Sequence, residues 1–189
     1  EANLAYEVVS LASKGVPEAI NTGAKIFERI MGKIDDGKWA EIRTVYQSKR
    51  KRAYSSRSGA FVFIGDGAGA AAHEMAHAAE YVSKTIQKAT RELFIKRCTG
   101  DVLKKYHGEV AWRDKFPTPY SGRSYFGGRW NPLPEGTVFD VKYIPQEMGG
   151  EIFSMWWTEL LTDPILFMQT DLEYFEWGYN LILKLQGIT

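Results

Sequence analysis

The chain has 189 residues, 44% of them hydrophobic, which is enough apolar material for one buried core without requiring two full domains. Its net charge of +1 excludes a strong overall attraction to nucleic acid or to a membrane surface, and we expect neither as a partner. The chain has one cysteine, Cys98, so no disulfide can form within it and the fold does not depend on an oxidising compartment.

The first third of the chain is predicted to mix helices and strands. In chain order we expect two amphipathic helices at residues 4–12 and 17–32, then a short helix or strand at 39–47. A hairpin of two strands is expected at 51–58 and 60–64. Pro17 suits the start of the second helix, because a proline at the first helical position gives up no hydrogen bond. The basic run at 49–52 is interpreted as a solvated strand edge or loop, with phosphate or acidic-partner binding as the alternative.

A long helix is predicted over residues 70–97, which are rich in good helix formers and are followed by Thr99-Gly100 as a stop signal. The glycine cluster before it also fits the G-x-G-x-x-A fingerprint of dinucleotide-binding folds, at Gly65, Gly67 and Ala70. A dinucleotide-binding fold needs a second strand soon after the helix. In this chain the helical pattern continues through the region where that strand would lie. We therefore interpret the glycines as a tight turn between the strand at 60–64 and the helix.

The last part of the chain is predicted to return to helices. Residues 99–134 hold many Gly, Pro and aromatic residues and are expected to form an irregular connection with short strands. Residues 137–143 alternate like a strand. Two helices are expected at 147–161 and 172–185, and their aromatic side chains are predicted to pack onto the helix at 70–97.

The segment His73-Glu74-Met75-Ala76-His77 predicts a metal site on that long helix. At 3.6 residues per turn, His73 and His77 lie on one helix face, so both imidazoles can reach a single Zn²⁺. Glu74 lies beside them, where it can take a proton from a zinc-bound water. The chain has only three histidines, and two of them occur here.

A catalytic zinc site usually has three protein ligands and a water, so a third ligand is needed. Glu80 lies on the same helix, but three ligands in a row along one helix are too far apart to converge, and we expect it to support the site or to lie on the surface. His107 stands in a polar stretch that is typical of an exposed turn. Glu151, at the start of a helix, is the favoured ligand, and Glu147 is the alternative, the other acid being available to bind a ligating histidine.

The motif of His73, Glu74 and His77, followed at a distance by a helix bearing Glu151, resembles the gluzincin group of zinc metallopeptidases. The stretch Glu151-Ile152-Phe153-Ser154 is similar to the thermolysin-like Glu-Ala-Phe-Ser pattern, which implies that Glu151 is the third ligand. Met155 departs from that pattern, where the family has Asp. A tyrosine before the ligand also resembles lethal-factor-like zincins, which implies that Tyr143 stabilises the oxyanion.

The C-terminal part also resembles the tail of some phage minor head proteins. The resemblance rests on three segments, at residues 119–125, 151–155 and 171–175, and covers roughly residues 60–189. Trp156 and Leu172 depart from the Gly and Pro of those proteins. The resemblance implies a phage or prophage origin, a place in the virion or the host-cell cytoplasm, and other virion proteins as partners.

The sequence as a whole predicts one α+β domain over residues 1–189. It is expected to be mainly helical and zincin-like, with a helical part at 1–48, a metallopeptidase core at 49–189, and a small antiparallel sheet beside the metal-binding helix. The expected activity is hydrolysis of a peptide or protein substrate, paired as an extended strand with residues 60–64. The alternative is a structural virion protein whose metal site is non-catalytic or vestigial.

Overall fold

The computed structural model describes residues 8–10, 16–31, 43–46, 54–55, 61–64, 67–123, 133–144 and 150–188. These ranges contain six α-helices: α1 (Glu18–Met31), α2 (Gly67–Val82), α3 (Lys84–Cys98), α4 (Ile152–Thr162), α5 (Pro164–Thr170) and α6 (Leu172–Leu185). They also contain two sheets, built from β1 (Val8–Ser10), β2 (Arg43–Tyr46), β3 (Tyr54–Ser55) and β4 (Phe61–Ile64), and from β5 (Lys104–Tyr106) with β6 (Glu109–Ala111). A mainly helical chain with separate small sheets is compatible with the predicted α+β class.

The sheet beside α2 has the order β1-β2-β4-β3 and is mixed. The predicted hairpin is confirmed, because β3 pairs antiparallel with β4, but β1, β2 and β4 run parallel to one another. A small antiparallel sheet is present as β5 with β6, whereas the sheet beside the metal-binding helix, which was expected to be antiparallel, is mixed. Strand β4 has neighbours on both sides, so the expectation that it offers an edge to a peptide is also wrong; β3 ends the order of strands described here.

The N-terminal prediction of two helices is half correct. The helix predicted at 17–32 is confirmed as α1, whereas residues 8–10 of the helix predicted at 4–12 form β1. Their two valines are β-branched and suit the parallel ladder with β2, which outweighs the weak helical pattern. The segment at 39–47, open between helix and strand, contains β2.

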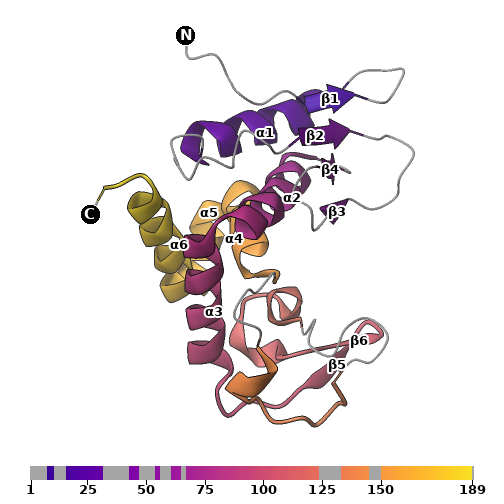
Figure 1. The fold of residues 1–189 in the computed structure, drawn as a ribbon, viewed down its shortest axis with the longest axis vertical. Helices are drawn as coiled ribbons and strands as arrows, with labels where there is room; N and C mark the ends of the chain where they lie inside the picture. Colours follow the sequence, from indigo (N-terminus) through magenta and orange to yellow (C-terminus); the bar gives the residue numbers. More distant parts are fainter. Residues whose placement is uncertain are drawn as a thin grey trace.

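Helix α2 lies at the centre of the molecule, between α1 on one side and α4 on the other (Figure 1). Its alanines allow this, because six of its residues have apolar side chains that are at most 1% exposed: Ala71, Ala72, Met75, Ala76, Ala78 and Ala79. A Cβ at Gly23 of α1 would stand 2.3 Å from the carbonyl oxygen of Ala68, so only glycine lets α1 come this close to α2.

The predicted helix over 70–97 is interrupted at Ser83. Its side chain caps the start of α3 by accepting a hydrogen bond from the amide of Ile86, at 3.3 Å. A serine that satisfies an N-terminal amide favours a new helix start over continuation of the old one. The two helices therefore take different directions, with α3 leading away from the sheet (Figure 1).

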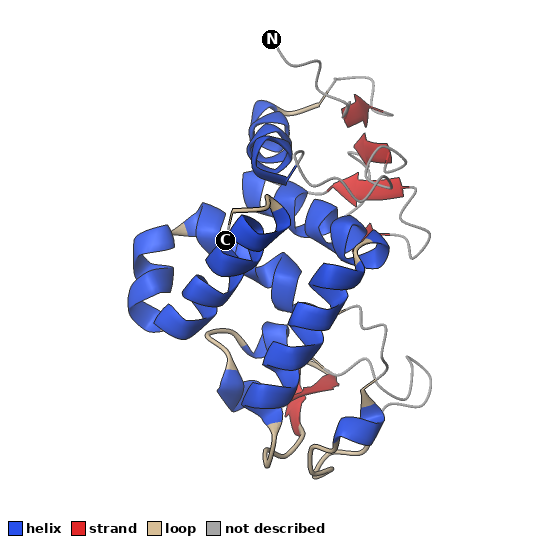
Figure 2. Cartoon of the chain, turned by 60° about the vertical axis from the view of Figure 1, so that its left-hand side comes forward, coloured by secondary structure: helices blue, strands red, loops and turns tan. Residues whose placement is uncertain are grey.

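The region after α3 forms the end of the molecule opposite the four-stranded sheet, as both views show (Figure 2). Here β5 and β6 pair through a turn at His107 and Gly108, both with positive φ. The strand predicted at 137–143 is wrong. Val138 makes only an isolated bridge to Val102, and the Asp140 carboxylate then accepts from the amide of Lys142 and begins the 3-10 helix η4 (Val141–Tyr143).

The C-terminal helices were predicted at nearly correct positions. Helix α6 has the predicted bounds, and α4 begins at Ile152, later than predicted, with Glu151 at its N-cap position; residues 145–149 lie outside the described part of the chain. Helix α5 was not anticipated. It begins at Pro164 after Asp163, whose carboxylate accepts from the amide of Leu166.

Aromatic side chains of α4 and α6 share one buried cluster with residues of α2, as predicted, although Tyr179 is exposed; their contact with α1 was not anticipated. Trp157 of α4 is fully buried, and its ring centroid lies 4.6 Å from that of Phe27 in α1. Trp156 is also buried and donates its indole N–H to the carbonyl of Phe175 in α6, at 3.1 Å. The position of α4 is therefore fixed from both sides.

Gly178 of α6 packs against Trp156 so closely that a Cβ would stand 2.2 Å from its ring. We expect Gly178→Ala to lower the free energy of unfolding by about 1–3 kcal/mol, because the hydrogen-bonded indole has no room to shift. Gly69→Ala is the matched control, since a Cβ there meets nothing closer than 3.9 Å and alanine favours a helix. Urea denaturation of the two variants tests this. Equal stabilities would contradict the packing argument.

Candidate metal centre

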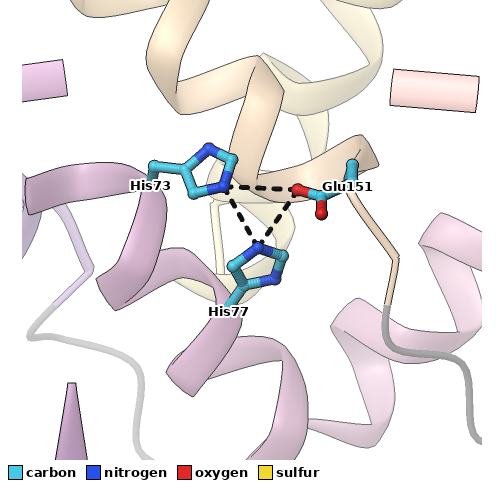
Figure 3. A group of neighbouring side chains, drawn as sticks. All are labelled: His73, His77 and Glu151. Carbon is cyan, nitrogen blue, oxygen red and sulfur yellow. Dashed lines mark hydrogen bonds and ion pairs between the residues drawn. The ribbon is translucent and has the colours of Figure 1, made fainter. Parts of the chain in front are cut away.

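Three side chains converge between α2 and α4. The Nε2 atoms of His73 and His77 lie 3.2 Å apart, and each lies 3.2 Å from Oε2 of Glu151 (Figure 3). Glu151 is 4% exposed, and the two histidine side chains are 14% and 12% exposed. The three potential ligand atoms therefore form a nearly equilateral triangle that is largely shielded from solvent but not closed.

The sequence places these atoms through two helices. His73 and His77 are one turn apart on α2 and project from the same face, as their spacing predicted. Glu151 stands at the N-cap of α4, with φ −97° and ψ 0°, and its own carbonyl starts the helix by accepting from the amide of Met155. Because α2 packs along α4, the N-cap residue of α4 meets the middle of α2.

The donor set fits a zinc ion. Zinc bound tetrahedrally at about 2.0–2.1 Å separates its ligand atoms by about 3.3 Å, close to the 3.2 Å measured along each side of the triangle. Two imidazoles and one carboxylate are also ligand types that zinc accepts, and three protein ligands leave the fourth corner open. Among the residues described, this is the cluster whose atoms can hold a metal ion.

Electrostatics within the triangle favour a charged glutamate. Burial alone would raise the pKa of Glu151, but the hydrogen bonds from His73 and His77 outweigh it and hold that pKa well below its usual range. Burial alone would lower the pKa of His77, but Glu151, with smaller contributions from Glu74 and Glu80, raises it above 6.5. The site therefore attracts positive charge, either as protons on the imidazoles or as a cation.

Glu80, in the last turn of α2, also supports the site. It is fully buried, contrary to the surface position that was one of its two expected locations, and its Oε2 accepts from the amide of Gly150 at 3.3 Å. Burial raises its pKa to about 7, although His77 and the Gly150 amide partly offset this. Glu80 thus joins α2 to the residue just before Glu151.

A second group of side chains approaches Glu151 from the 3-10 helix η3 (Pro119–Gly122). The guanidinium of Arg123, which follows η3 and is buried, lies 3.7 Å from Oε1 of Glu151 and also pairs with Glu109. It stands 4.5 Å from the centre of the Tyr120 ring, and that ring lies 6.2 Å from the His73 ring. A cation and an aromatic ring therefore border the metal centre.

The other predicted site residues lie in different places. Glu74 is buried on α2 between the two histidines, close enough to raise the pKa of His77. Tyr143 is half-buried in η4, where its ring has the Lys142 ammonium 5.0 Å away. His107 is exposed at the tip of the β5–β6 hairpin, so it is not a ligand, and Glu147 lies outside the described residues.

Sequence reasoning missed three polar residues that contact the triangle. Ser154 and Thr158 of α4 and Arg123 were not assigned a role, although Thr158 Oγ1 lies 3.1 Å from Nδ1 of His73. Only the spacing of Ser154 and Thr158 from Glu151 carried a signal. Ser154 and Thr158 lie three and seven positions after Glu151, so they share the helix face that bears Glu151.

Comparisons of the chain with protein-family models, with curated proteins and with solved structures found no match. Within the described residues, none of the helices has the length and apolar character needed to cross a membrane. The geometry and chemistry of the site are therefore the basis for inferring a function.

Glu80 gives a pH-dependent prediction for the zinc-free protein. Its pKa in the fold, about 7, lies above the ordinary 4.5, so the folded state holds the extra proton and loses stability as pH rises from about 4.5 to about 7. Relative to Glu80→Gln, the wild type should lose up to about 3 kcal/mol across this range. Urea denaturation in the presence of a chelator measures the difference. Glu92→Gln, an exposed change on α3, is the control; a pH-independent difference for Glu80→Gln would contradict the prediction.

Proposed function

We propose that the chain is a zinc-dependent metallopeptidase whose metal is held by His73, His77 and Glu151. The observation that carries the proposal is the triangle of two imidazole nitrogens and one carboxylate oxygen with sides of 3.2 Å. Its ligand types and spacing suit tetrahedral zinc, and three ligands leave a position for water. Glu147 remains the alternative third ligand, although Glu151 already occupies that place in the triangle.

Zinc in such a site supplies Lewis acidity that lowers the pKa of water toward about 7. Glu74 is the general base in this proposal. It follows His73 on α2 and is 6% exposed, so its carboxylate acts in a dry environment where proton transfer is not diverted to bulk water. The same carboxylate then delivers the proton to the departing amine, which completes hydrolysis of the peptide bond.

A group that stabilises the developing oxyanion completes the proposed mechanism. Tyr143 was the residue expected in this role. Tyr120 of η3, however, is the tyrosine whose ring lies near the His73 ring, and the Arg123 guanidinium stands over the Tyr120 ring. Positive charge next to a phenol favours its donation of a hydrogen bond. We therefore propose Tyr120, in addition to Tyr143, as a candidate for this role.

The proposed substrate is a peptide or protein segment, and the proposed setting is a virion or the cytoplasm of a phage-infected or lysogenic cell, with other virion proteins as further partners. The second candidate function is a structural virion protein with a non-catalytic metal site. A structural zinc site is normally closed by four protein ligands, whereas the cluster in the described residues offers three. That difference supports the enzyme.

Zinc binding is the first test. We expect one Zn²⁺ per chain in the wild type, measured by elemental analysis after dialysis, and its loss in His73→Ala, His77→Ala and Glu151→Ala, because two ligands no longer form a catalytic zinc site. The exposed His107→Ala is the matched control and should keep the metal. Full zinc occupancy in Glu151→Ala would exclude Glu151 as the third ligand and would direct attention to Glu147.

Peptide cleavage separates the two candidate functions. Against a peptide library, we expect turnover in the wild type that a chelator abolishes and added zinc restores. Glu74→Gln should keep the zinc but lose at least about 100-fold in kcat, since it removes the general base. A zinc-loaded wild type that cleaves no member of the library would favour the non-catalytic virion protein. Full turnover by Glu74→Gln would instead reject the role of Glu74.

A further inference from the structure

Thr158 makes a contact with the metal centre that comes from the same helix as Glu151. Its hydroxyl oxygen lies 3.1 Å from Nδ1 of His73, on the side of the imidazole opposite the nitrogen that faces Glu151. The hydroxyl also donates a hydrogen bond to the carbonyl of Ser154, one turn earlier in α4, at 3.1 Å. Thr158 therefore lies between the histidine ring and the backbone of α4.

The direction of these hydrogen bonds determines which nitrogen of His73 can bind a metal. A threonine hydroxyl has one hydrogen, and when that hydrogen points to the Ser154 carbonyl the oxygen can only accept. Nδ1 of His73 must then carry the proton that it donates to Thr158. The lone pair of the neutral ring is left on Nε2, the atom that faces His77 and Glu151.

We propose that Thr158 is a positioning residue that fixes the tautomer and the ring orientation of His73 for metal binding through Nε2. The inference rests on the proposed zinc site and adds the residue that supports one of its ligands. A ligating histidine generally donates its second N–H to an acceptor that holds the ring. Here the acceptor is a neutral hydroxyl on α4.

His77 does not share this arrangement within the residues described. Its Nδ1 is buried and has no hydrogen-bond partner in that part of the chain, and the carboxylate of Glu80 on the next turn accepts from Gly150 instead. The two histidines are thus supported unequally. A change at Thr158 should therefore act on His73 alone.

The chemistry of the acceptor also matters. A carboxylate acceptor would carry a full negative charge and would make the imidazole a stronger donor to the metal, whereas a threonine fixes the ring without adding charge. The site already holds the buried carboxyl groups of Glu74, Glu80 and Glu151, so a neutral acceptor adds no further buried negative charge.

Zinc affinity and the His73 ring proton test the proposal together. In a competition titration with a chromophoric chelator, we expect Thr158→Val to weaken Zn²⁺ binding about tenfold, the low end for loss of such a partner. Thr158→Ser keeps the hydroxyl and should restore most of the affinity. In the zinc-loaded protein with ¹⁵N-labelled histidine, the Nδ1–H resonance of His73 should move in Thr158→Val and stay in Thr158→Ser.

Thr162→Val is the matched control. Thr162 lies one turn further along α4 and also donates to a helix carbonyl, that of Thr158, at 2.7 Å, but its hydroxyl contacts no histidine in the described structure. It should change neither the affinity nor the His73 resonance. A general effect of removing a helical threonine hydroxyl would appear in both valine variants.

The outcomes separate this inference from the proposed function. A wild type that binds zinc while Thr158→Val binds it equally, with an unmoved His73 resonance, overturns the role of Thr158 and leaves the zinc site intact. A wild type that binds no zinc overturns both. If Thr158→Val does not fold, NMR spectra of the zinc-loaded wild type test the role of Thr158 instead. Coupling of the His73 Nδ1–H to the Thr158 methyl group supports the role, and metal binding through Nδ1 rejects it.

Discussion

The close packing of α4 along α2 is the constraint on which the rest of the structure depends. It brings a glutamate from the start of one helix to two histidines in the middle of the other, which lie 78 and 74 positions earlier in the chain (151 − 73 and 151 − 77). The small side chains of α2 permit this approach, and the buried tryptophans of α4 hold it. The metal centre thus forms only where α2 and α4 pack together, and helices α1 and α6 contribute by fixing the position of α4.

The same helix pair resolves the electrostatic problem of a buried acidic site. Two of its buried acids meet a counterpart from a different element: Glu151 meets the imidazoles of α2 and the guanidinium of Arg123, and Glu80 meets the backbone amide of Gly150. Buried charges are tolerated only with such partners. Burial raises the pKa of Glu80 to about 7, because His77 and the Gly150 amide offset only part of the cost of removing its charge from water.

Sequence reasoning reached the parts of this structure that are local. The spacing of His73 and His77 on a helix follows from helical geometry, and α6 could be bounded from its periodic pattern. The remaining features depend on contacts between residues that are far apart in the sequence. Nothing local distinguishes Val8-Val9 in a strand from the same residues in a short helix, and no spacing rule brings Arg123 to Glu151. Glu151 was reached because it begins an apolar helix, while the hydroxyl of Thr158 matters only through a partner 85 positions away.

The end of the molecule that carries β5 and β6 leaves the centre through α3 and returns to it at α4. Tyr120 and Arg123 of this region border the metal centre, whereas the exposed tip of the β5–β6 hairpin lies away from it. That tip is consequently the place where insertions, deletions or a grafted recognition element are tolerated with least disturbance to the centre. The exposed hairpin tip at His107 and Gly108 is the natural point for such a graft, and homologous chains are expected to differ there most in length.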